Sequence, residues 1–288
     1  MMINEKAYAK LNISLDVSRP REDGYHDMVM VMQTISLCDD ISLSLTDDAV
    51  VKASCNLPYI PGDERNLAVK AAKLFLREIG REDAGMRITI NKRIPVGAGM
   101  AGGSSDAAAV LRGMNHLFDH ALEEERLMAL AGMAGSDVPF CLLGGTALAE
   151  GRGEVLTGLP PLPECTIVVC KPEFSISTPE LFHALDKVRL RTHPDTAGIV
   201  AALEKGSLKD VCRRMYNVFE AVPDRRMKTA AGIERILLSA GAEGAIMTGT
   251  GSAVFGIFTG ESAAAEACKA LSAEYPFVCT AKPVGKLL

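Results

Sequence analysis

The sequence contains no tryptophan, and aromatic residues make up only 5% of its 288 positions. It has no apolar run near the ~18 residues that cross a membrane, and its N-terminus is charged where a secretion signal would be apolar. None of the eight cysteines forms a Cys-x-x-Cys pair, and several lie in apolar runs, as small core residues do in a reducing compartment. We therefore expect a cytoplasmic protein.

An excess of positive charge is also missing. The 31 lysines and arginines are outnumbered by 36 aspartates and glutamates, which leaves a formal net charge of −5. Such a balance provides no general attraction for nucleic acid or for an anionic membrane. We expect neither as a partner, and nothing in the sequence indicates an obligate protein partner. An anionic ligand must therefore be held by a local group of residues.

Glycine, by contrast, is concentrated in one stretch near the middle of the chain. Four glycines occur within seven positions, at 97, 99, 102 and 103. Glycine lets a ligand approach the backbone and permits the positive φ angles of a tight anion-binding loop. Ser104 or Ser105 is expected to cap the following helix, whose unsatisfied N–H groups and dipole favour phosphate. The predicted triphosphate cradle comprises Pro95, Val96, Gly97, Ala98, Gly99, Met100, Ala101, Gly102, Gly103, Ser104 and Ser105.

Two other interpretations of this stretch exist. Gly97-x-Gly99-x-x-Gly102 matches the dinucleotide-binding fingerprint, which requires a second parallel strand within about thirty residues. Residues 121–133 instead have the pattern of a second helix, and the Gly-Lys-Ser/Thr ending of a P-loop is missing. A purely structural loop is the other alternative, but four glycines cost chain entropy that a simple connection need not lose. The nucleotide cradle is therefore preferred.

The first half of the chain is predicted to contain strands and helices. Residues 7–17 alternate between apolar and polar, which predicts a half-buried strand with Lys10 and Asn12 on its polar face. A solvated edge is the common explanation of such a face. Asp137 follows two predicted helices, and a lone aspartate there is more often a helix cap than a functional group. Further strands are predicted near 26–37, 41–45, 50–55 and 86–90, with a helix capped by Asp63 between the last two.

A proline cluster at residues 158–163 predicts a domain boundary, giving domains 1–158 and 159–288. The second half interleaves strands with helices, so the predicted class is α+β. Residues 247–252 form a second glycine-rich turn between two apolar strands, either a simple hairpin connection or a functional loop. His116 and His120 have i, i+4 spacing, but without a third ligand an exposed helix face is preferred to a metal site. The predicted strands are 165–170, 244–247, 253–258 and 276–281, and the helices 178–187, 195–204, 226–239 and 261–272.

These pieces, in this order, resemble the GHMP kinase superfamily. The motifs are Ala9-Lys10-Leu11-Asn12, Asp23-Gly24-Tyr25-His26, the glycine-rich stretch, Ser136-Asp137-Val138-Pro139 and Met247-Thr248-Gly249-Thr250-Gly251-Ser252. Lys-Leu-Asn followed by Asp-Gly-Tyr-His resembles the members that phosphorylate a cytidine-diphosphate-linked alcohol. The resemblance implies a two-domain α+β kinase fold with its active site in the cleft between the domains.

The resemblance also implies cofactors and roles. ATP is the phosphoryl donor, and a divalent cation, expected to be Mg²⁺, assists, although the sequence does not indicate its ligands. Asp137 is expected to deprotonate the acceptor hydroxyl, and Lys10 to stabilise that carboxylate and the transferred charge. The residues expected to bind the small-molecule substrate are Asn12, Tyr25, His26, Thr178 and Phe182.

Two departures from the family pattern stand out. Ala101 occupies a position where glycine is usual, which is tolerable if its φ is negative. Asn217-Val218-Phe219-Glu220 stands where the family commonly has Asn-Asp before an apolar residue. Mevalonate or homoserine kinase remains the alternative among kinases, but Tyr25 and His26 suit a cytosine base. A non-catalytic nucleotide sensor would need neither Lys10 nor Asp137.

Overall fold

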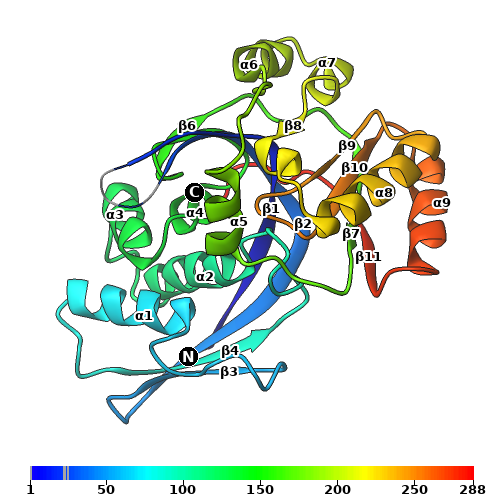
Figure 1. Ribbon diagram of the computed structural model, residues 1–288. Coiled ribbons are helices and arrows are strands. Elements are labelled where there is room, and N and C mark those ends of the chain that lie inside the picture. The colour runs from blue at the N-terminus through cyan, green and yellow to red at the C-terminus, as the bar shows by residue number, and fades with distance from the viewer. Residues whose placement is uncertain (1, 22–23, 25) are drawn as a thin grey trace.

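Two long antiparallel strands, β1 (Met2–Pro20) and β2 (His26–Thr46), run through the middle of the molecule (Figure 1). The computed structural model describes residues 2–21, 24 and 26–288, so Asp23 and Tyr25 lie outside the described residues. The predicted strands at 26–37 and 41–45 are one continuous strand. In β1 the apolar set from Ala7 to Val17 is buried as predicted, but Lys10 and Asn12 are buried too. β1 is therefore an interior strand rather than a solvated edge.

β1 and β2 belong to a seven-stranded sheet with the order β3-β4-β2-β1-β8, to which β5 and β6 attach through β2. Four helices from the first half of the chain pack together beside this sheet (Figure 1). The added strands are β3 (Val51–Cys55), β4 (Gly85–Asn91), β5 (Thr146–Glu150), β6 (Val155–Gly158) and β8 (Tyr216–Asn217). The helices are α1 (Leu67–Glu78), α2 (Gly102–Leu117), α3 (Glu124–Ala134) and α4 (Val138–Leu143).

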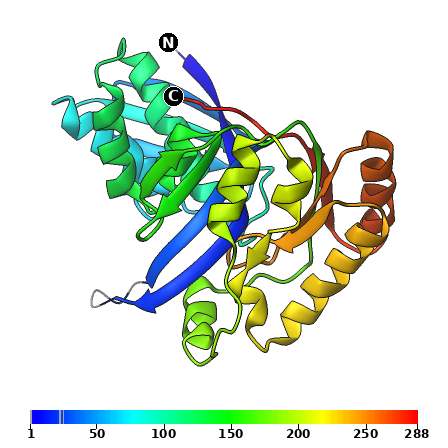
Figure 2. The ribbon, with the colours of Figure 1, turned by 90° about the horizontal axis from the view of Figure 1, so that it is seen from above.

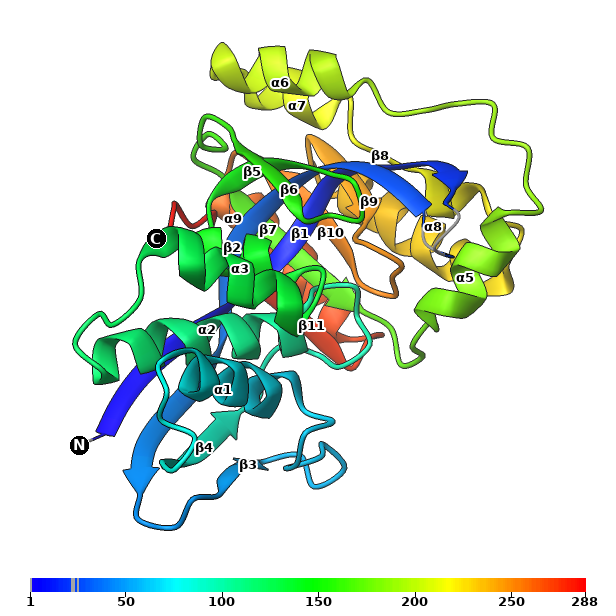
Figure 3. The ribbon, with the colours of Figure 1, turned by 90° about the vertical axis from the view of Figure 1, so that its left-hand side faces the viewer.

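A second, four-stranded antiparallel sheet has the order β11-β7-β10-β9 and is built from β7 (Thr166–Lys171), β9 (Gly244–Met247), β10 (Val254–Phe258) and β11 (Phe277–Ala281). Its long helices are α8 (Arg225–Ser239) and α9 (Glu261–Ser272), which confirms the α+β class. Shorter helices α6 (Thr196–Glu204) and α7 (Leu208–Cys212) lie at the opposite end of the molecule from α1 (Figure 3). α5 (Thr178–Leu185) and the 3-10 helix η1 (Val218–Ala221) complete this half.

The two halves of the chain contribute to each other's structure. β8 pairs in parallel with β1 at Ser14 and Leu15. The C-terminal segment runs back to the first half, where Pro283 bridges Ile35 and Lys286 bridges Gly144 (Figure 2). The division at residue 158 stays a prediction. No helix in the described part of the chain is long and apolar enough to cross a bilayer.

Two predicted helix caps are wrong. α2 begins at Gly102, so Ser104 and Ser105 lie inside its first turn, and Ser105 Oγ donates to the Ala101 carbonyl at 3.1 Å. Ala101 takes the cap position with φ 57° and ψ 28°, so the negative φ that would make an alanine tolerable there is not observed. The left-handed conformation costs an alanine roughly 1–2 kcal/mol, and packing of Ala101 against the neighbouring core offsets that cost. For α1 the cap is Asn66, whose side chain accepts from Ala68 N at 2.9 Å, whereas Asp63 pairs with Arg65.

Candidate active site

A cavity of about 870 Å³ is lined by residues from both sides of the proline cluster. The glycine-rich stretch forms one wall, and α5 and the second glycine-rich turn contribute others. Lys10, His26, Asp137, Thr178 and Phe182 line this cavity together. Residues 95–104 line it as well, whereas Ser105 and Asn12 do not. The fold thus brings together most of the residues that the sequence singles out.

The two glycine-rich turns contact each other. Gly99 has φ 74°, and a Cβ built there would lie 2.2 Å from the Thr248 carbonyl oxygen. A Cβ on Gly249 would lie 2.8 Å from the Gly99 oxygen. Thr248 Oγ1 donates to that same oxygen at 3.3 Å, and Ala253 N donates to the Ala98 oxygen at 3.2 Å. The second turn is therefore more than a hairpin connection, because it supports the first turn and reaches the cavity.

Gly102 and Gly103, which open α2, differ in what surrounds them. A Cβ on Gly102 would lie 3.0 Å from Lys92 Nζ and 3.1 Å from Ile94 Cγ2. A Cβ on Gly103 would have only Leu67 Cδ1, at 4.0 Å, as a neighbour. The N–H groups in the first turn of a helix have no intrahelical acceptor and suit an anion. Space on the cavity side of Gly103 is thus open to a ligand.

Lys10 is held at the cavity wall by Asn12. Its Nζ donates to Asn12 Oδ1 at 2.6 Å, and it is only 5% exposed. Asn12 is fully buried, and its backbone N–H donates to Thr248 Oγ1 at 3.0 Å. Asn12 thus connects Lys10 to the second glycine-rich turn and does not face the cavity.

Asp137 occupies the N-cap position of α4, yet its side chain makes no capping hydrogen bond. The usual structural explanation for such an aspartate is therefore not observed. Among the described residues no ion pair joins Asp137 to Lys10, although both line the cavity. Burial, together with the Asp137 charge, raises the pKa of the nearby Cys141 thiol to about 12, so this cysteine is neutral. Asp137 therefore presents a carboxyl group on the cavity wall that does not cap its helix.

An aromatic group lines another part of the cavity, its aromatic end. The His26 and Phe182 rings have centroids 4.9 Å apart and are tilted by 33°, and Phe219 contacts Phe182 edge-on at 4.9 Å. His26 Nε2 lies 2.8 Å from Asp186 Oδ1. Thr178 at the start of α5 bonds to Thr250 of the second turn at 3.0 Å. These contacts connect α5 to β2 and to the second glycine-rich turn.

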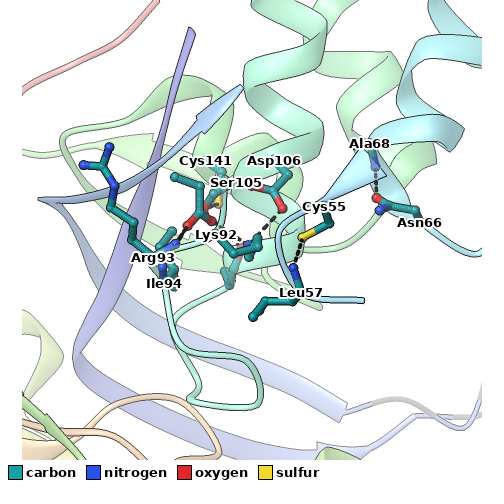
Figure 4. A network of polar contacts seen from close by, with 12 residues as sticks. Cys55, Leu57, Asn66, Ala68, Lys92, Arg93, Ile94, Ser105, Asp106 and Cys141 are labelled. Carbon is teal, nitrogen blue, oxygen red and sulfur yellow. Dashed lines mark hydrogen bonds and ion pairs between the residues drawn. The ribbon is translucent and has the colours of Figure 1, made fainter. Parts of the chain in front are cut away.

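The sequence analysis missed a buried charged group beneath the glycine-rich stretch. Figure 4 shows Lys92 and Asp106 directed toward each other near the start of α2, with Nζ and Oδ2 2.9 Å apart. Lys92 also pairs with the fully buried Asp39, which accepts from Ile94 N at 2.8 Å. Burial alone would lower the pKa of Lys92, but the two carboxylates outweigh that effect and raise it. No sequence pattern could have revealed this group, because its members come from three separate elements.

Asp106 is the less well stabilised of the two carboxylates that pair with Lys92. Burial raises its pKa to about 8, with Lys92 opposing the shift and Asp39 adding to it. Its Oδ1 atom is buried without a hydrogen-bond partner. Asp106 and Asp39 thus compete for the single ammonium group of Lys92. Lys92 itself stays charged beneath the N-terminus of α2.

The oxygen-bearing side chains on the cavity wall are of the kind that bind Mg²⁺. The described residues contain no group of three histidine, cysteine or acidic side chains that could hold a metal ion. Mg²⁺ is commonly bound through one or two carboxylates, with phosphate oxygens and water completing its shell. Asp137 and Ser104 both line the cavity and suit that role. His116 instead pairs with Glu5 at 3.0 Å, and His120 lies in the turn after α2, so the expected shared helix face of the two histidines is not observed.

Comparisons with known proteins agree with this geometry. Residues 66–145 match the model of the GHMP kinases N terminal domain, and residues 199–276 match the GHMP kinases C terminal model. A 4-diphosphocytidyl-2-C-methyl-D-erythritol kinase from Clostridium botulinum (strain Eklund 17B / Type B) is 46% identical over 256 residues, which are 89% of this chain and 91% of the relative.

Solved structures are similar over nearly the whole chain. A 4-(cytidine 5'-diphospho)-2C-methyl-D-erythritol kinase has a TM-score of 0.82 and 34% identity, over 98% of this chain and 100% of the other. A homoserine kinase from Cytophaga hutchinsonii has a TM-score of 0.78 over 99% of this chain and 95% of the other, but at 20% identity it shows the fold alone. This chain therefore belongs to the GHMP kinases and, within them, to the family of 4-diphosphocytidyl-2-C-methyl-D-erythritol kinases.

Proposed function

We propose that this enzyme transfers the γ-phosphoryl group of ATP to the 2-hydroxyl of 4-diphosphocytidyl-2-C-methyl-D-erythritol. The products are the 2-phosphate and ADP, in the methylerythritol phosphate pathway to isoprenoid precursors. The observation that carries the proposal is the single cavity wall shared by Lys10, Asp137 and the glycine-rich stretch, in a chain 46% identical to a kinase of this name. A cytoplasmic location fits its eight free cysteines.

The glycine-rich stretch is proposed to hold the triphosphate. Residues 95–104 line the cavity, and the open side of Gly103 lets phosphate oxygens approach the first turn of α2. The helix dipole and its unsatisfied N–H groups favour the negative charge there. Beneath Gly102, Lys92 offsets the negative charge of the buried Asp39 and Asp106. Ser105 supports the loop from behind through its bond to Ala101 rather than by facing the ligand.

Asp137 and Lys10 are proposed to carry the chemistry. The acceptor hydroxyl loses its proton to the Asp137 carboxylate as its oxygen bonds to the γ-phosphorus and the bond to the ADP oxygen breaks. Lys10, held in place by Asn12, stabilises the charge on the transferred group. Bound Mg²⁺ would neutralise charge on the β- and γ-phosphates, and Ser104 is the wall residue that would hold it while Asp137 serves the acceptor hydroxyl.

The aromatic end of the cavity is proposed to bind the cytidine. The His26 and Phe182 rings are in contact there, and Tyr25 adjoins His26 in the sequence. Stacking of a base on an aromatic side chain contributes about 1–3 kcal/mol. Thr178 at the start of α5 is placed to bind the same substrate. The proposed division into domains 1–158 and 159–288 would put His26 on one side of the boundary and Thr178 and Phe182 on the other.

A coupled assay of ADP release tests the function directly. The purified chain is given ATP and Mg²⁺ with one of three acceptors: 4-diphosphocytidyl-2-C-methyl-D-erythritol, mevalonate or homoserine. We expect turnover with the cytidyl acceptor only. Comparable turnover of mevalonate or homoserine would contradict the proposal, because neither acceptor has a base for the aromatic end. ADP release independent of any acceptor would favour a nucleotide sensor or simple ATPase.

A further inference from the structure

A hydrogen bond between His26 and Asp186 at the aromatic end of the cavity joins two distant parts of the chain. His26 is the first residue of β2, and Asp186 directly follows α5. His26 Nε2 lies 2.8 Å from Asp186 Oδ1, and the two side chains are 11% and 38% exposed. Both residues line the cavity. The pair therefore lies where a ligand at this end would meet the imidazole.

The carboxylate determines which ring nitrogen carries a proton. An ionised carboxylate only accepts hydrogen bonds, so His26 Nε2 must be the donor. In a neutral imidazole the other nitrogen, Nδ1, is then an acceptor. The tilted ring contact with Phe182 restrains the ring plane as well. Asp186 and Phe182 together hold His26 in one tautomer and one orientation.

We propose that Asp186 is a positioning residue that makes His26 Nδ1 an acceptor for the exocyclic amino group of cytosine, so that the site prefers cytosine to uracil. This inference rests on the proposed function. Uracil carries a carbonyl oxygen where cytosine carries the amino group, so two acceptors would face each other. A site built to receive a donor rejects an analogue that lacks it, because the buried polar group is left unpaired.

The helix that carries Asp186 is held by contacts that do not involve the carboxylate. The Asp186 backbone N–H donates to the Phe182 carbonyl at 3.0 Å, and Thr178 bonds to Thr250 at the other end of α5. Replacing Asp186 by asparagine leaves both contacts intact. The asparagine amide can either donate or accept, so it no longer enforces the tautomer. Asp186→Asn thus removes the control of the His26 tautomer and keeps the contacts that hold α5.

The test compares the cytidyl substrate with its uridine-diphosphate counterpart. In Asp186→Asn we expect KM for the cytidyl substrate to rise about tenfold, which corresponds to ~1.4 kcal/mol. kcat and KM for ATP should stay within about twofold, and the cytidyl-over-uridyl ratio of kcat/KM should fall at least tenfold. The matched control is Asp16→Asn, because Asp16 forms a similar pair with His193 at 2.9 Å and neither residue lines the cavity. That variant should match the wild type in every constant.

A double-mutant cycle separates positioning from simple support of α5. If Asp186 acts through the imidazole, Asp186→Asn should have little further effect on KM or base preference in a His26→Asn background. An equal effect in both backgrounds would overturn the assignment. Wild-type turnover of the cytidyl substrate with an unchanged KM and base preference in Asp186→Asn would overturn it while leaving the proposed function intact. If the wild type fails to phosphorylate the cytidyl substrate, the proposed function fails and this assignment fails with it.

Discussion

The ammonium group of Lys10 bonds to the side-chain oxygen of Asn12 at 2.6 Å, and not to Asp137. Two residues apart on β1, they lie on the same side of the strand. Asn12 in turn receives support from Thr248 in the second glycine-rich turn. The lysine that is proposed to act on the phosphoryl group is thus positioned by a buried amide, which leaves the Asp137 carboxylate available to the acceptor hydroxyl.

Replacing Asp137 by asparagine should remove the proposed base and keep the shape of the side chain. A positioned general base contributes typically about 10² to 10⁴ in rate, so we expect kcat to fall by that factor. KM for both substrates should change little. The measurement is steady-state kinetics, together with single-turnover rates to establish that chemistry limits turnover. A variant that keeps more than about a tenth of the wild-type rate would show that Asp137 is not the base.

Asn12→Ala distinguishes a residue that binds substrate from one that positions Lys10. Because Asn12 is fully buried and does not line the cavity, we expect kcat to fall about tenfold while KM for the cytidyl substrate stays nearly constant. Loss of a buried hydrogen-bonding group should also cost about 1–3 kcal/mol in stability, measured by denaturant unfolding. A large increase in KM with little change in kcat would instead support direct substrate contact.

Gly103→Val is the sharpest test of the phosphate cradle. Its added side chain meets no protein atom closer than Leu67 Cδ1, at 4.0 Å from the Cβ position, but it enters the cavity. We expect ATP affinity measured by calorimetry to fall at least tenfold, with unfolding unchanged. Gly102→Val is less suitable because it would also push against Lys92 and Ile94.

Gly132→Val provides the matched control for this variant. Gly132 also lies in a helix with nothing within 4 Å of its Cβ position, and it does not line the cavity. This variant should bind ATP like the wild type. If Gly103→Val also retained the wild-type affinity, the start of α2 would not contact the phosphates.

The half-buried acid Glu220 should make the protein more stable at mildly acidic pH. Burial, together with Glu234, raises the pKa of Glu220 from 4.5 to about 8. Between these values the folded state binds a proton that the unfolded state does not, so the free energy of unfolding falls as pH rises. The limit is about 1.4 kcal/mol per pH unit for one proton. Asp106, whose pKa is also raised by burial, adds a change of the same sign.

Glu220→Gln should reduce this dependence between pH 5.5 and 8. Glutamine keeps an acceptor for the Met247 N–H, which lies 2.8 Å from Glu220 Oε1, and removes the titration. Denaturant unfolding across the window measures the slope. Glu261→Gln is the control, because ion pairing lowers the pKa of that exposed carboxyl and keeps it ionised throughout. If the free energy of unfolding varied with pH in the same way in the wild type and in Glu220→Gln, Glu220 would not be the group that causes the dependence.

Much of the fold could be predicted because its signals are local. Alternation over residues 7–17, helical spacing over 261–272 and glycine in two turns report backbone conformation directly. The same locality explains the errors. Nothing nearby distinguished Asp63 from Asn66 as the α1 cap, or showed that packing would hold Ala101 in a left-handed conformation. Cap choice and strain depend on what the rest of the molecule places against a segment.

The sequence by itself determined the glycine-rich stretch, the strand that carries Lys10 and the motifs that indicate the kinase family. Only the tertiary structure decided that Lys10 and Asp137 share one cavity, that Asn12 does not line it, and that Asp186 reaches His26. It also assembled Asp39, Lys92 and Asp106 into one buried group. The physical reason is that backbone propensity acts over a few residues, whereas burial and charge pairing act between side chains that chain folding alone brings together.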